Sequence, residues 1–102
     1  LVDFGFSEGI GSKKRPVLII SAEPYHRDRE EVIVAAITHN IKRVLFGDTK
    51  IDNWERAGLI YPSLVTGIVR TIKEDMIIRK LGILPKSDLE KVQENIRKAI
   101  GL

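Results

Sequence analysis

Two short apolar runs, residues 16–20 (PVLII) and 32–37 (VIVAAI), limit most strongly what this chain can fold into. Both are rich in β-branched side chains, which favour strands. Both are far shorter than the ~20 apolar residues that a membrane-spanning helix needs. They therefore predict core strands of a soluble protein. Residues 17–20 are apolar at every position, so we expect this strand to be buried on both faces.

The rest of the chain predicts further strands and two helices. Residues 1–6, 63–72 and 76–84 have strand-like patterns, and the last two runs are separated by the acidic turn Glu74-Asp75. Short connections favour antiparallel pairing, and these two runs are long enough to bend around a small barrel.

A charged turn is expected at residues 23–30. Residues 52–58 (DNWERAG) predict a short helix, because an Asx cap, a glutamate three residues later and a closing glycine follow one another. Residues 87–90 (SDLE) match a capping box before a C-terminal helix. The apolar residues of that helix recur at helical spacing: Leu89, Val92, Ile96, Ala99 and Ile100.

These elements predict a mainly β fold, a small SH3-like β-barrel made of a curved antiparallel sheet with one short helix and a C-terminal α-helix. A chain of 102 residues can close one hydrophobic core but not two. We therefore expect a single domain over residues 1–102. The sequence starts at Leu1 within an expected strand, so the extreme N-terminus could be missing.

Charge and composition restrict the chemistry. The 17 lysines and arginines face 14 aspartates and glutamates, for a net charge of +3, and they form no basic tail. A nucleic-acid partner would therefore need a local patch. The chain has no cysteine and only 2 histidines, which excludes disulfides and thiolate metal sites and leaves little for a zinc or iron centre. We expect no metal and no cofactor, and either metal-free chemistry or pure binding remains.

One basic cluster is expected on a glycine-containing loop. Lys13 and Lys14 stand next to Arg15 after residues 7–12 (SEGIGS). Such a cluster could steer phosphates, although three charges are also common on a solvated loop. Ser12 could hydrogen-bond a phosphate or base, and Phe6 could either stack on a base or belong to the core.

Two segments carry a family resemblance: residues 11–22 (GSKKRPVLIISA) and 32–40 (VIVAAITHN). They resemble the MazF/PemK family of toxin–antitoxin ribonucleases, in particular a PemK-like subgroup. Later pieces occur in the order that this subgroup shows, so that the likeness covers nearly the whole chain: residues 52–59, Pro62-Ser63, Val69-Arg70-Thr71-Ile72, and Leu81-Gly82-Ile83-Leu84 before the last helix.

The resemblance implies a strongly curved SH3-like barrel of the CcdB/MazF type. It also implies a homodimer that binds RNA in a groove along its interface, and a cognate antitoxin protein that releases growth inhibition. The activity it implies is that of a metal-independent endoribonuclease, which cleaves single-stranded RNA or mRNA by attack of the 2′-hydroxyl and so inhibits translation. We accordingly expect a cytoplasmic protein that does not bind membranes.

The resemblance also implies the catalytic residues. In this family an arginine just before the proline and a threonine at the end of the AAIT strand form the active site; here they are Arg15 and Thr38. A guanidinium group is a rigid fork that matches two phosphate oxygens and stays charged, which suits Arg15 to charge stabilisation. The family suggests a general-acid role for it as well. Thr38 can donate its hydroxyl to a phosphate oxygen. Apart from the family resemblance, Arg15 would be interpreted as an ordinary surface charge and Thr38 as an ordinary strand-forming residue.

Further residues have two readings each. His39 could act as a general base or contact RNA, because histidine titrates near neutrality. In a regular strand, however, it would point to the opposite face from Thr38 and lie on the surface or at the dimer interface. Arg70 could face the RNA groove or pair with an acid. Trp54 reads as a lid over one barrel end rather than as a stacking residue. The general base stays open.

Two other functions fit the same fold. A non-nucleolytic binding toxin, such as a CcdB-like gyrase inhibitor, would not need the Arg15 and Thr38 pair. An inactive SH3-like interaction module would need an exposed aromatic groove for peptides, and the six aromatic residues are scattered along the chain.

Overall fold

The computed structural model describes residues 1–7 and 12–102, with the side chains of residues 3–7, 12 and 13 left out. The elements follow one another along the chain as β1 (Val2–Ser7), β2 (Ser12–Ile19), α1 (Glu23–Arg29), β3 (Glu31–Thr38), β4 (Thr49–Lys50), β5 (Leu64–Lys73), the 3-10 helix η1 (Glu74–Met76), β6 (Ile77–Lys80) and α2 (Lys86–Ala99).

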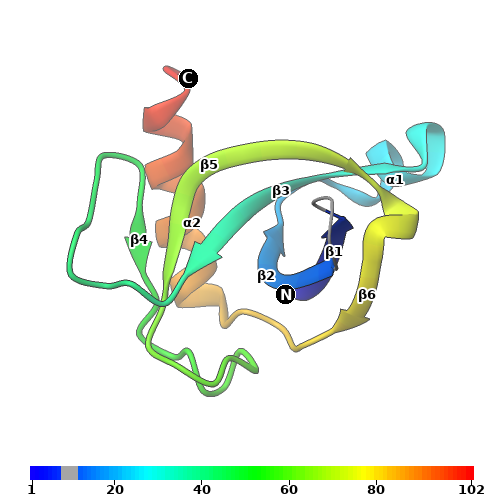
Figure 1. Cartoon of the computed structure of the whole chain (residues 1–102). Coiled ribbons are helices and arrows are strands. Elements are labelled where there is room, and N and C mark those ends of the chain that lie inside the picture. Colours follow the sequence, from blue (N-terminus) through cyan, green and yellow to red (C-terminus); the bar gives the residue numbers. More distant parts are fainter. Residues whose placement is uncertain (8–11) are drawn as a thin grey trace.

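The strands form one antiparallel sheet in the order β4-β5-β3-β2-β1-β6. Strand β5 arches along the sheet, and η1 then turns the chain into β6 at the opposite edge (Figure 1). The predicted mainly β fold with a curved antiparallel sheet is confirmed. Among the described residues the edge strands β4 and β6 do not pair, so the sheet curls without closing into a hydrogen-bonded barrel.

A bulge in β5 accounts for part of this curvature. The β3–β5 register changes between Ala35 and Ile37, so that three residues of β5, numbers 66–68, face Ala36 alone. Extra residues in one strand bend that strand and increase its twist. The Thr66 hydroxyl donates to the Ala36 carbonyl at 2.7 Å and accepts the N–H of Ile68 at 3.2 Å. The Asp48 carboxylate accepts the N–H of Gly67 at 2.9 Å. These three hydrogen bonds satisfy backbone groups at the bulge, where the regular pairing of β3 and β5 is interrupted.

Replacing Thr66 by valine should lower the free energy of unfolding by roughly 1–2 kcal/mol. The Thr66 side chain is buried, so the substitution removes the donor to the Ala36 carbonyl and leaves that oxygen unpaired. Urea unfolding at a fixed protein concentration measures the change as a lower midpoint at constant m-value. Thr71→Val, at an exposed position of the same strand, is the matched control and should change stability little. Equal stability of Thr66→Val and wild type would show that the hydroxyl does not hold the bulge.

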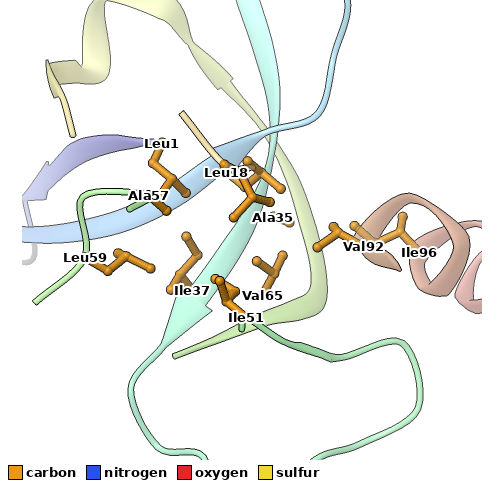
Figure 2. Close-up of a cluster of buried hydrophobic side chains, with 11 residues drawn as sticks. Leu1, Leu18, Ala35, Ile37, Ile51, Ala57, Leu59, Val65, Val92 and Ile96 are labelled. Atoms are coloured by element: carbon orange, nitrogen blue, oxygen red, sulfur yellow. The ribbon is translucent and has the colours of Figure 1, made fainter. Parts of the chain in front are cut away.

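The sheet has apolar side chains on both faces. Eleven buried residues form the main core between the sheet, the 51–59 segment and α2 (Figure 2): Leu1, Leu18, Ala35, Ile37, Ile51, Ala57, Leu59, Val65, Leu84, Val92 and Ile96. A second cluster lies on the other side: Val2, Val17, Val32, Val34 and Ile72. Because Val17 and Leu18 belong to different clusters, the prediction that this strand is buried on both faces is confirmed.

The short helix lies elsewhere than predicted. Residues 52–58 form successive turns, and the segment predicted as a charged turn contains α1. Gly58 adopts a φ of +93°, and a Cβ there would lie 2.2 Å from the Leu81 carbonyl oxygen. Gly58, which was predicted to end a helix, instead permits two backbone segments to approach closely. The α1 helix has a proline in its first turn, where the missing N–H costs nothing.

The start of α2 also differs from the predicted capping box. The helix begins at Lys86 with Pro85 as N-cap and no side-chain cap. Asp88 is fully buried and points to another segment: its carboxylate accepts the N–H groups of Asp52 and Asn53 at 2.9 and 3.2 Å, and the Asn53 side-chain amide at 3.0 Å. Asp88 thus fixes the 52–58 turns against α2.

The predicted apolar stripe of α2 holds over most of the helix. Val92 and Ile96 are buried in the main core, and Leu89 packs against it, whereas Ala99 and Ile100 are exposed. On the outer side, Lys91 and Asp52 form an ion pair of 2.7 Å. A hydrogen bond and the charge of Lys91 lower the pKa of Asp52. This pair is exposed, so we assign it no large share of stability.

Candidate active site

A hollow of about 190 Å³ lies where β2, β3 and β5 meet. We call it the arginine hollow; its lining residues are Arg15, Pro16, Val17, Val34, Ala36, Ile37, Ile68 and Arg70. Most of its lining residues are apolar, and two arginines from different strands, Arg15 of β2 and Arg70 of β5, complete the lining. Such an arrangement suits a ligand with an anionic group next to apolar or aromatic surface.

The β2 strand sets the place of Arg15. Val17 is buried and pairs with Ala36 of β3, and this is the last residue pair at that end of the β2–β3 ladder. Arg15 lies two residues before Val17 and therefore on the same face of the strand. It stands beyond the paired part of the two strands and is exposed. The guanidinium can thus reach solvent and the hollow together.

The bulge in β5 sets the place of Arg70. Arg70 pairs with Val34, and Ile68 lies on the same face two residues before it. Both side chains are exposed and both line the hollow. Arg70 thus shares a surface with Arg15, and the reading in which it faces an RNA groove stays a prediction. Within residues 1–7 and 12–102, neither arginine has an ion-pair partner. Their charges are therefore available to an anion.

Thr38 lies at the end of β3, outside the lining of the hollow. Its side chain is partly exposed, and the hydroxyl oxygen accepts the N–H of Asn40 at 3.2 Å. The hydroxyl proton can still be donated. If the β2–β3 register continued by two residues beyond Val17 and Ala36, Arg15 would stand opposite Thr38. Thr38 thus ends β3 two residues beyond the last β2–β3 pair, and Arg15 lies within β2 two residues beyond that same pair.

The other predicted RNA contacts are spread around this site. Lys14 is exposed and adjacent to Arg15, so strand alternation directs it to the opposite face. The side chains of Ser12 and Lys13, like that of Phe6, lie outside the described residues. The prediction that Ser12 and Lys13 lie on a loop is wrong, because the backbone of both residues belongs to β2 and pairs with β1. His39 is exposed and lies against the ring of Tyr61.

Two residues of this surface were not predicted from the sequence, Ile68 and Tyr61. A glycine inside a strand often marks a bulge, so Gly67 was the available signal for the bulge that includes Ile68. Tyr61 lies in an irregular segment between β4 and β5, where no periodicity indicates which way a side chain points.

The described residues contain no group of three or more His, Cys, Asp or Glu side chains that could hold a metal ion. In the same part of the chain, no helix has the length and apolar character needed to cross a bilayer.

Residues 1–100 match the family described as "PemK-like, MazF-like toxin of type II toxin-antitoxin system". The chain belongs to this family. No curated protein matches the sequence. The solved structure of the Mycobacterium tuberculosis toxin MazF-mt6 is 29% identical with a TM-score of 0.79, and the match covers 100% of this chain and 98% of the other.

Two further structures share the fold of this PemK-like toxin. One is an endoribonuclease in complex with its cognate antitoxin from a mycobacterial species, at 18% identity and a TM-score of 0.77, covering 99% of this chain and 92% of that one. The other is MazE–MazF from Deinococcus radiodurans, at 16% identity and a TM-score of 0.81, covering 99% and 92%. At these identities the similarity establishes a MazF-like fold.

Proposed function

We propose that this toxin is a metal-independent endoribonuclease that cleaves single-stranded RNA, including mRNA, and thereby inhibits translation and growth. One observation carries the proposal: Arg15 and Arg70, which have no described ion-pair partner, border the same hollow. Fixed guanidinium groups suit a phosphate whose charge increases during reaction. Family membership supports the same conclusion, as does the fact that one protein with this fold is named an endoribonuclease.

The nucleophile of this reaction comes from the RNA itself, and the protein needs only to exchange protons with it. The ribose 2′-oxygen forms a bond to the adjacent phosphorus while the bond from phosphorus to the 5′-oxygen breaks. The 2′-proton passes to a base, and the leaving 5′-oxygen receives a proton. The products are a 2′,3′-cyclic phosphate and a 5′-hydroxyl. In this scheme Arg15 stabilises the phosphorane and, as the family resemblance suggests, supplies the proton, while Thr38 donates its hydroxyl to a phosphate oxygen.

Replacing Thr38 by valine should lower the single-turnover rate of RNA cleavage by roughly 10-fold, because one neutral donor to the phosphate is lost while the shape of the side chain is kept. Thr38→Ser keeps the donor and should retain most of the activity. A fluorescent RNA oligonucleotide with saturating protein gives the rate. Equal rates for Thr38→Val and wild type would remove Thr38 from the mechanism.

A homodimer, a cognate antitoxin and a cytoplasmic location belong to the same proposal. The support is again family membership, together with the cognate antitoxin that accompanies the mycobacterial endoribonuclease in its complex. Light scattering at micromolar concentration should give twice the 11.5 kDa mass of the chain. Expression without a partner should arrest growth, and co-expression of the antitoxin should restore it.

The runner-up function is a non-nucleolytic toxin that inhibits gyrase, and a cell-free test separates the two. Our proposal expects purified toxin to abolish translation from an added mRNA and to leave DNA supercoiling by gyrase unchanged. The reverse pattern would support the gyrase inhibitor. No effect in either assay would support an inactive SH3-like module.

A further inference from the structure

An exposed aromatic pair stands next to Thr38, outside the arginine hollow. The ring centroids of His39 and Tyr61 are 5.5 Å apart, with planes inclined by 40°. Both residues are exposed, and Tyr61 has 57% of its surface accessible. An aromatic pair that serves the core would be buried. These two residues are instead exposed to solvent.

The backbone around the pair is held by hydrogen bonds. Thr38 pairs with Leu64 of β5, which keeps the end of β3 beside the segment that carries Tyr61. The Ser63 hydroxyl donates to the Tyr61 carbonyl at 2.7 Å, and Ser63 itself is buried. On the other side, the N–H of Asn40 bonds to the Thr38 hydroxyl oxygen. The aromatic pair is therefore a preformed surface feature whose position is tied to Thr38.

The segment after His39 is basic. Lys42 and Arg43 are exposed, and residues 39–47 contain no acidic side chain. Within the described part of the chain, neither cation takes part in an ion pair. The N–H of Lys42 bonds to the Asn40 side-chain oxygen at 3.3 Å, which ties this basic segment to the aromatic pair. Aromatic faces next to unpaired cations are the pattern of surfaces that bind single-stranded nucleic acid.

We propose that His39 and Tyr61 form a base-stacking subsite for a nucleotide adjacent to the scissile phosphate, and that Lys42 and Arg43 bind the phosphates beyond it. The inference rests on the proposed ribonuclease function and names how that site holds its substrate. Stacking on an aromatic face does not depend on base identity. The subsite therefore positions the strand, and sequence choice arises elsewhere.

Binding of an RNA that cannot be cleaved tests this subsite separately from catalysis. We would measure fluorescence anisotropy with a labelled RNA oligonucleotide, identical to one that the wild-type protein cleaves but with a 2′-O-methyl group at every position. Tyr61→Ala should weaken binding by about 5- to 100-fold, the usual range for loss of one stacked base. Tyr61→Phe keeps the aromatic face and should stay within about 2-fold of wild type. Ile60→Ala, at the exposed neighbour, is the matched control and should not change binding.

Abasic nucleotides locate the stacked base. A scan of single abasic positions should find one next to the cleavage position that weakens binding to wild type. For the Tyr61→Ala variant, the same abasic RNA should bind almost as tightly as the intact RNA. The substitution and the abasic position remove the same stacking interaction, so their effects do not add. His39→Ala provides a second variant in case Tyr61→Ala does not fold, and it should show the same dependence to a smaller degree.

The outcomes separate this inference from the function on which it rests. If wild-type protein neither cleaves nor binds RNA, the proposed function fails and the subsite fails with it. If wild type cleaves RNA but Tyr61→Ala and His39→Ala bind the uncleavable RNA as tightly as wild type, only the subsite is wrong. Unchanged RNA affinity together with loss of the dimer in light scattering would assign the aromatic pair to a protein contact and overturn the inference.

Discussion

Replacing Arg15 by alanine should lower the single-turnover rate of RNA cleavage by about 100- to 1,000-fold, the usual cost of removing one preorganised donor from a transition state. The side chain is exposed and has no ion-pair partner among the described residues, so its removal should leave the melting temperature unchanged. The loss would then measure stabilisation of the reacting phosphate and not damage to the fold.

Two variants sharpen this test. Arg15→Lys keeps the charge but loses the planar fork, so its rate should fall between those of wild type and Arg15→Ala. Arg27→Ala removes the same charge from an exposed position on α1 and should cleave RNA like wild type, which controls for the change in net charge. Full activity of Arg15→Ala would remove Arg15 from the active site.

Replacing Asp88 by alanine should lower the free energy of unfolding by about 2–4 kcal/mol, and the melting temperature by roughly 10–20 °C. The carboxylate has no exposed surface, and it accepts the backbone N–H groups of both Asp52 and Asn53. Alanine leaves these donors unpaired and opens a cavity between α2 and the 52–58 turns. Thermal unfolding followed by circular dichroism, at a fixed protein concentration, measures the shift.

The amide variant Asp88→Asn keeps the size of the side chain but replaces one accepting oxygen by a donor, so its stability should lie between those of wild type and Asp88→Ala. Glu90→Ala is the control on the same helix. Its carboxylate is exposed, and its ion pair with Lys86 spans 4.0 Å, so the substitution should change the free energy of unfolding by less than about 0.5 kcal/mol. If Asp88→Ala were as stable as wild type, Asp88 would not hold the turns in place.

The strands and their antiparallel arrangement could be predicted from the sequence because their pattern is local. Residues 32–37 are all apolar and mostly β-branched, and such a run has few alternatives to a buried strand. The short helix could not be placed, because its outcome depends on distant partners. The turn-forming residues Asp52 and Asn53 bond to Asp88, which lies about one third of the chain away. No local pattern contains that contact.

The candidate site also contains residues that could be predicted from the sequence and residues that could not. Arg15 and Thr38 could be proposed from the family resemblance together with the reach of their side chains. That Arg70 shares a hollow with Arg15 depends on the bulge at residues 66–68, which changes the register between β3 and β5. Tyr61 belongs to an irregular segment, and the long-range pairing of Thr38 with Leu64 helps to bring that segment beside His39.

The most direct test of the ribonuclease proposal is to incubate the purified protein with a mixture of single-stranded RNAs in excess EDTA and to map both new ends of each fragment. We expect cleavage that the chelator does not reduce, with a 2′,3′-cyclic phosphate on one side of the cut and a 5′-hydroxyl on the other. Intact RNA, cleavage that EDTA abolishes, or fragments with a 3′-hydroxyl and a 5′-phosphate would contradict the proposal.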